Sequence, residues 1–256
     1  MPHGVEASEL SARQVQYRAS DGVALFGYLV GECSNNGPVI LAFHGNADLS
    51  RWLVPWATGA ARTTGACVML PEYRGYDGIV GVPSYEASAR DARAALAYVR
   101  DSMHVAPSRL VYFGHSLGTA IAAELAAIEP PRALVLQSPF STARAMASRM
   151  FLPGLTAFWG LVSRVHFNTI SRVRSLTAPV WVAHGDRDSI IPVSMGREVF
   201  DAAPVRGELL IVRGAGHNDV AEMGGADYWA WLERAVRGSD VGGVTPGARA
   251  KRQSAP

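Results

Sequence analysis

Lysine is almost absent from this sequence. Of its 24 basic residues only Lys251 is a lysine, so nearly all positive charge is carried by arginine. The arginines are scattered among 22 acidic residues, and the formal net charge is +2. Proteins that bind nucleic acids usually gather basic residues into a patch or stripe. We therefore expect no nucleic-acid partner.

Cysteine is also scarce. The only two, Cys33 and Cys67, show neither a CxxC motif nor the Cys/His spacing of a metal site. Cys67 lies in the apolar run 66–70, whereas Cys33 lies in a polar loop. Because the two cysteines lie in such different segments, we predict two free thiols in a reducing compartment. No metal or cofactor is expected.

Long hydrophobic runs are missing. No apolar run approaches the roughly 18 residues that a membrane span needs. The first ten residues show no basic segment followed by an apolar one, as a secretory leader would. We expect a soluble, cytoplasmic protein without a transmembrane segment; the sequence leaves its oligomeric state open.

The apolar residues that are present occur in short runs that predict strands. Length of 256 residues and 48% hydrophobic content suit one large α/β domain. Two strands are expected around the Asp21-Gly22 turn, and further buried strands alternate with helical stretches, which predicts a mostly parallel sheet with helices on both faces. The expected strands are 14–19, 23–30, 39–43, 66–70, 109–113, 133–137, 179–183 and 207–212, and the expected helices are 86–101, 117–128, 193–202 and 226–237.

One long connection interrupts this alternation. We interpret 141–175 as a short lid insertion within a domain spanning 14–237, and 238–256 as a disordered tail. The lid is rich in large apolar groups, which either complete the core or roof an acyl pocket. The candidate pocket residues in it are Phe151, Leu155, Phe158 and Trp159.

The motif Gly114-His115-Ser116-Leu117-Gly118 follows an expected strand and opens an expected helix. This strand–turn–helix context is what a G-x-S-x-G nucleophile turn requires, because the serine is held out at the carboxyl end of the sheet. We predict that Ser116 is a nucleophile. The amide of Leu117, at the start of the helix, is then one donor of an oxyanion hole, and the amide of Asn46, after the strand 39–43, is the expected second donor.

A serine hydroxyl needs a base from another loop at the same edge of the sheet. Among the seven histidines, His217 lies in a glycine-rich loop after the last expected strand; His115, next to the nucleophile, should point away from it. The acid that orients the base should lie between the two in sequence, and the loop after 179–183 offers Asp186 and Asp188. We favour Asp188 and keep Asp186 as the alternative.

These motifs together resemble the short-lidded α/β-hydrolases, a family of esterases and thioesterases. The resemblance runs from about Gln14 to Val236, in the order H-G-N, P-E-Y-R-G-Y, G-H-S-L-G, S-P-F, H-G-x-x-D-x-x-I-P and G-x-G-H-N-D. It implies an eight-stranded, mostly parallel sheet and hydrolysis of esters or thioesters without metal or cofactor. It maps the triad onto Ser116, Asp188 and His217, and the oxyanion hole onto Asn46 and Leu117.

The chain departs from the family pattern after Tyr76, where it reads Asp77-Gly78-Ile79-Val80-Gly81. This loop shapes the acyl pocket, whose walls we expect Tyr76 and Phe140 to line. The predicted function is hydrolysis of a small-molecule carboxylic ester, or a thioester, with an apolar acyl group. An amidase, a peptidase or an acyltransferase could use the same triad, and a non-catalytic binding module remains a further alternative.

Overall fold

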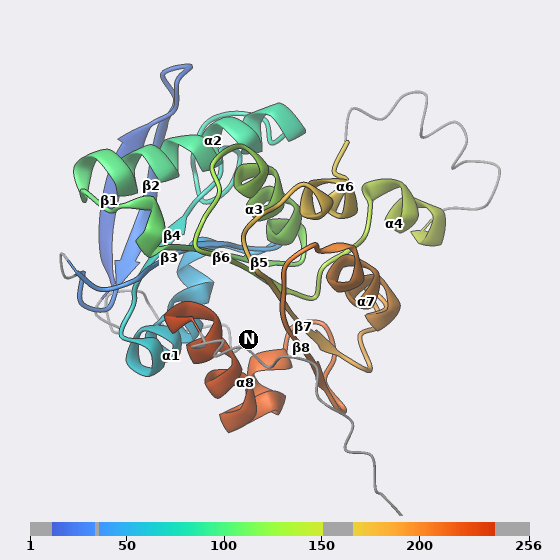
Figure 1. Ribbon diagram of the computed structural model, residues 1–256. Coiled ribbons are helices and arrows are strands. Elements are labelled where there is room, and N and C mark those ends of the chain that lie inside the picture. Colours follow the sequence, from blue (N-terminus) through green and yellow to red (C-terminus); the bar gives the residue numbers. More distant parts are fainter. Residues whose placement is uncertain (1–11, 34–35, 151–165, 239–256) are drawn as a thin grey trace, which may run out of the picture.

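The computed structural model describes residues 12–33, 36–150 and 166–238 (Figure 1). Its centre is one eight-stranded sheet in the order β1-β2-β4-β3-β5-β6-β7-β8. The strands are β1 (Arg13–Arg18), β2 (Ala24–Val30), β3 (Val39–Phe43), β4 (Cys67–Pro71), β5 (Leu110–His115), β6 (Ala133–Gln137), β7 (Val180–Gly185) and β8 (Arg206–Val212).

Strand direction divides the sheet into two parts. β1 pairs antiparallel with β2, and β2 pairs antiparallel with β4. From β4 to β8 every pairing is parallel. The middle parallel strands are buried along their whole length, as strands covered by helices on both faces must be. The predicted α/β class and the eight-stranded, mostly parallel sheet are confirmed.

Helices cover both faces of the sheet. Those against one face are α2, α3, α6 and α7, and those against the other are α1 and α8 (Figure 1). The helices are α1 (Val54–Thr64), α2 (Tyr85–Ala97), α3 (Leu117–Ile128), α4 (Ala143–Met150), α6 (Thr169–Arg174), α7 (Val193–Ala202) and α8 (Val220–Arg237).

The helices α1 and α8 differ from expectation. α1 was not predicted, because its sequence mixes Thr, Gly and Trp, which are weak helix formers. Burial of Val54, Trp56 and Ala60 against the sheet stabilises it instead. α8 begins at Val220 rather than at 226, and a non-helical glycine, Gly225, kinks it.

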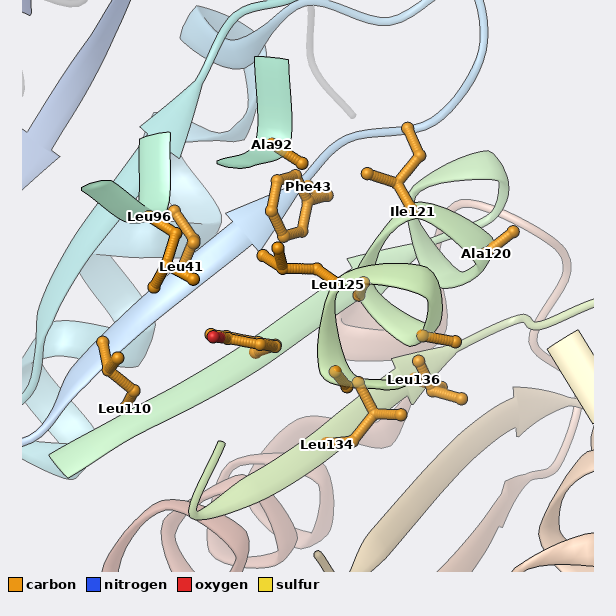
Figure 2. Close-up of a cluster of buried hydrophobic side chains, with 14 of the residues drawn as sticks. Leu41, Phe43, Ala92, Leu96, Leu110, Ala120, Ile121, Leu125, Leu134 and Leu136 are labelled. Atoms are coloured by element: carbon orange, nitrogen blue, oxygen red, sulfur yellow. The ribbon is translucent and has the colours of Figure 1, made fainter. Parts of the chain in front are cut away.

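The core under α2 and α3 brings the nucleophile turn close to β3. Leucines and a phenylalanine from the strands pack against alanines and larger aliphatic residues of the helices (Figure 2). The helix α3 can approach closely because it is rich in alanine. At its first turn the approach is tightest: a Cβ on Gly118 would lie 2.1 Å from the carbonyl oxygen of Phe43. Only glycine fits there, so the end of β3 lies directly against the start of α3.

The two cysteines form a disulfide, so the prediction of free thiols is wrong. β2 runs antiparallel to β4 with Val30 opposite Val68, which places the loop after β2 beside the first residue of β4. The Cα atoms of Cys33 and Cys67 are 4.7 Å apart. The pairing of strands that are not neighbours in sequence decides this, and cysteine content no longer supports a reducing compartment. The cytoplasmic location stays a prediction.

Within the described ranges, no helix is both long enough and apolar enough to cross a bilayer. The helices α4 and α6 lie within the predicted lid insertion, and Val173 of α6 is fully buried in the core. That part of the insertion completes the core. Phe151, Leu155, Phe158 and Trp159 lie outside the described residues, as does 239–256, so the lid, the tail and the domain limits stay predictions.

Candidate active site

Ser116 occupies a sharp turn between β5 and α3. Its backbone has φ 54° and ψ −117°, a conformation that residues with a side chain rarely adopt. The turn is stabilised because the Ser116 amide donates to Gln137 and the Thr119 hydroxyl donates to the Ser116 carbonyl. A Cβ on Gly114 would lie 2.3 Å from the Gly118 carbonyl oxygen, which explains a glycine at that flank.

Two other loops bring a base and an acid to this serine. His217 follows β8, and its Nε2 lies 2.9 Å from Oγ of Ser116. Asp188 follows β7, and its Oδ2 lies 2.7 Å from Nδ1 of His217. Because all three residues follow the carboxyl ends of parallel strands, residues 101 positions apart in sequence meet at one edge of the sheet.

The surroundings of Asp188 keep it ionised. Burial alone would raise its pKa, but hydrogen bonds from His184, from His217 and from the Ile191 amide outweigh burial and hold the pKa well below the usual range of aspartate. Oδ1 accepts from the amides of Ile190 and Ile191 at 2.9 and 2.8 Å. An ionised Asp188 accepts a hydrogen bond from Nδ1–H of His217, which keeps the proton on Nδ1 and leaves Nε2 free to accept a proton from Ser116.

Asp186, the alternative acid, has a different place. Its Oδ1 accepts from the amide of Gly214 at 2.7 Å, which joins the loop after β7 to the loop after β8. The structure therefore brings Asp188, and not Asp186, to His217.

This arrangement is supported by three polar residues to which the sequence analysis assigns no role at the site. The carbonyl of His217 accepts from Nε2 of His115 at 3.2 Å and from the Ser138 hydroxyl at 3.3 Å. His115 thus faces the His217 loop; desolvation, followed by repulsion from His217, lowers the pKa of His115 to about 4. His184 donates to the Ile191 carbonyl and lies 3.3 Å from Asp188. The only feature of the sequence that could have pointed to these three residues is their position at the ends of expected strands.

The two segments that carry the predicted oxyanion donors meet at Ser116. Leu117 is the first residue of α3, and the first amides of a helix have no partner within it. Across from it, a Cβ on Gly45 would lie 3.3 Å from Cβ of Ser116, so the loop after β3 packs on the serine. Asn46 follows in that loop, and its Oδ1 accepts from the Tyr76 hydroxyl at 2.8 Å.

Of the predicted pocket residues, the structure describes Tyr76 and Phe140, and the two lie in different surroundings. Tyr76 is partly buried and borders the Asn46 loop, as expected of a pocket wall. Phe140 is buried in the main core. A hollow of about 340 Å³ lies elsewhere, between α2 and α3; Tyr85, Glu124 and Arg172 are among the residues lining it, and Ser116 is not.

Among the residues that the structure describes, no group of three or more His, Cys, Asp or Glu side chains could hold a metal ion.

Comparison with known proteins adds the family context. The family described as serine aminopeptidase, S33, matches residues 35–169. The chain is 38% identical over 210 residues to uncharacterized protein Rv2307c of Mycobacterium tuberculosis, covering 82% of this chain and 73% of that protein. It is 30% identical over 204 residues to human alpha/beta hydrolase domain-containing protein 17B, covering 79% of this chain and 66% of the human protein.

A solved structure shares the fold. The esterase PF2001 of Pyrococcus furiosus superimposes with a TM-score of 0.71, covering 92% of this chain and 95% of that one, at 19% sequence identity. At this identity the similarity shows the architecture, and the catalytic role of each residue has to be argued from the geometry above.

Proposed function

The chain belongs to the serine aminopeptidase S33 family of α/β-hydrolases, and from this membership we propose that it is a serine hydrolase cleaving carboxylic esters through an acyl-enzyme on Ser116. The observation that carries the proposal is the continuous hydrogen-bonded chain from Ser116 through His217 to Asp188, with separations of 2.9 and 2.7 Å. Both distances suit proton transfer and orientation of the base.

The proposed reaction has two halves. Oγ of Ser116 attacks the ester carbonyl carbon while Nε2 of His217 takes the hydroxyl proton. The carbonyl oxygen becomes an oxyanion and accepts from the amides of Asn46 and Leu117. The carbon–oxygen bond to the alcohol then breaks, and His217 returns its proton to the leaving alcohol. Water repeats these steps on the acyl-enzyme and releases the acid and free Ser116.

Asp188 contributes through charge. The imidazolium that forms on His217 during each half-reaction lies 2.7 Å from a carboxylate that stays ionised. A charge-assisted hydrogen bond of this kind is stronger than one between neutral groups. It also fixes the tautomer that the reaction needs.

The substrate class is proposed from the surface near the site. The loop after β4, which carries Tyr76, exposes two valines, Val80 at 86% and Val82 at 79%. This loop begins at the carboxyl end of β4, at the edge of the sheet where Ser116 lies, and its Tyr76 donates to Asn46. An apolar acyl group gains about 0.8 kcal/mol for each CH₂ that such a surface removes from water.

A peptidase is the second candidate, because the matching family is described as a serine aminopeptidase. The triad alone serves both reactions. A panel of p-nitrophenyl esters of increasing chain length, a thioester and an aminoacyl anilide separates them. The proposal expects the highest kcat/KM among the esters, and a preference for the anilide would replace it by the peptidase. Product analysis with an added alcohol tests for acyl transfer.

The experiment on mechanism is Ser116→Ala. The variant should stay folded and lose ester hydrolysis by several orders of magnitude, because the nucleophile is gone while the binding surface remains. A fluorophosphonate should label the wild type at Ser116 and leave the variant unlabelled. Ser102→Ala, at an exposed serine beyond α2, is the matched control and should keep both properties. Substantial esterase activity in Ser116→Ala would refute the role of Ser116.

A further inference from the structure

A buried carboxylate lies behind the loop that carries Asn46. Glu72, the residue after β4, is fully buried and accepts four hydrogen bonds. Its Oε1 accepts from Nε2 of His44 at 2.8 Å and from the Tyr73 amide at 3.0 Å. Its Oε2 accepts from the amide and the hydroxyl of Ser50, both at 2.9 Å. Four donors hold the carboxylate in one orientation.

Both ring nitrogens of His44, the partner histidine, face oxygen atoms. Nε2 of His44 faces Glu72, and Nδ1 faces the carbonyl oxygen of Gly45 at 2.8 Å. Burial by itself would raise the pKa of Glu72, yet the hydrogen bonds from His44 and from the neighbouring amides lower it, so this carboxyl is ionised. His44 and Glu72 therefore form a buried hydrogen-bonded pair, and the contact of Nδ1 with the Gly45 carbonyl ties the ring to its own loop.

Tyr73 restrains His44 as well. Its hydroxyl donates to the His44 carbonyl at 3.1 Å, and its ring lies 4.1 Å from the imidazole, centroid to centroid. Side chain and backbone of His44 are thus both held by residues that follow β4.

The restrained backbone lies directly against the nucleophile turn. A Cβ on Gly118 would approach the His44 carbonyl oxygen to 2.7 Å, and one on Gly45 would approach Cβ of Ser116 to 3.3 Å. The His44–Gly45 segment is therefore clamped between the buried carboxylate and the turn. The next amide along the chain is that of Asn46.

We propose that Glu72 and His44 are positioning residues that hold the Asn46 amide where the oxyanion forms. The inference rests on the proposed function, because it concerns the oxyanion hole of that reaction. Neither residue touches substrate. An oxyanion donor acts only within about 2.7–3.1 Å of the oxygen. A displacement of about 1 Å can lower the rate by about 100-fold.

The test is Glu72→Gln, whose amide nitrogen must face donors on one side or the other. We expect kcat for a p-nitrophenyl ester to fall about 10- to 100-fold with KM nearly unchanged. The Kd of a trifluoromethyl ketone, which forms an oxyanion adduct with Ser116, should rise by a similar factor. The Kd of the matching secondary alcohol should not change. Glu124→Gln is the control, because Glu124 is another buried carboxylate with a side-chain partner, Arg172, at 2.7 Å; it should leave all these values unchanged.

Unchanged kcat in a folded Glu72→Gln protein, or equal weakening of ketone and alcohol, would overturn the inference. If that variant does not fold, Tyr73→Phe decides, because it removes one hydrogen bond to His44 without leaving a buried charge. It should weaken ketone binding about fivefold and spare the alcohol; unchanged ketone binding overturns the inference. A wild type that fluorophosphonate does not label at Ser116 refutes the proposed function itself.

Discussion

The most informative single substitution is Asp188→Asn, because the surrounding donors dictate how the new amide must lie. Oδ1 of Asp188 accepts from the amides of Ile190 and Ile191, and Oδ2 accepts from Nδ1 of His217. In the variant the carbonyl oxygen has to keep the place of Oδ1, since two backbone amides can only donate. The NH₂ group then faces His217.

This orientation traps the base in the wrong tautomer. An NH₂ group donates to Nδ1 of His217, so the ring proton moves to Nε2, which can no longer accept a proton from Ser116. Turning the amide around would take the acceptor from the N–H groups of Ile190 and Ile191, the second of which is buried, at a cost of about 2–4 kcal/mol. Loss of the carboxylate beside the imidazolium adds about 1.5–3 kcal/mol to the barrier. Together these effects predict a fall in kcat of about 10³- to 10⁵-fold.

The assay is steady-state hydrolysis of a p-nitrophenyl ester, with Asp186→Asn as the matched control. Asp186 accepts a single hydrogen bond, from Gly214, and an asparagine oxygen can accept it equally well. We expect that variant to keep most of its activity. Thermal unfolding of both variants should stay close to the wild type. Equal losses in the two variants, or a mild loss in Asp188→Asn, would refute the assignment of Asp188.

Three further outcomes concern stability. The folded-state pKa of His115 is lowered to about 4, against a usual value near 6.5, so the unfolded chain binds more protons between these pH values. The free energy of unfolding should therefore fall by about 3 kcal/mol as the pH drops from 6.5 to 4. In urea unfolding of His115→Gln, the slope of this free energy against pH should be shallower by about one proton, and an unchanged slope contradicts this. Cys33→Ser opens a bridge between residues 34 positions apart and should lower the free energy of unfolding by up to about 4 kcal/mol, as reductant does to the wild type; no difference between oxidised and reduced wild type would argue against the bridge. Trp231→Ala empties a fully buried site in α8 and should cost about 3–5 kcal/mol in chemical denaturation, whereas a cost below about 1 kcal/mol would mean that the surrounding core collapses into the space.

Local patterns predicted most of the sheet. The apolar runs that became β3 and β6 agree with the structure residue for residue, because strands buried on both faces need apolar side chains at every position. The bounds of α3 also agree with the prediction, since its alanine-rich sequence follows directly after the glycine-flanked Ser116. The helix α1 was missed because its packing on the sheet, and not its own propensity, stabilises it.

The predicted site residues could be named because each follows a strand, and a parallel sheet gathers such residues at one edge. The sequence by itself determined the order of Ser116, an aspartate of the loop after β7 and His217, and the fold that carries them, since apolar periodicity and turn residues are local properties of the chain. Only the tertiary structure decided which aspartate reaches His217, that Cys33 meets Cys67, and that Glu72 lies behind Asn46. Those contacts join segments far apart in sequence, and strand pairing and burial, which no local pattern encodes, set their distances.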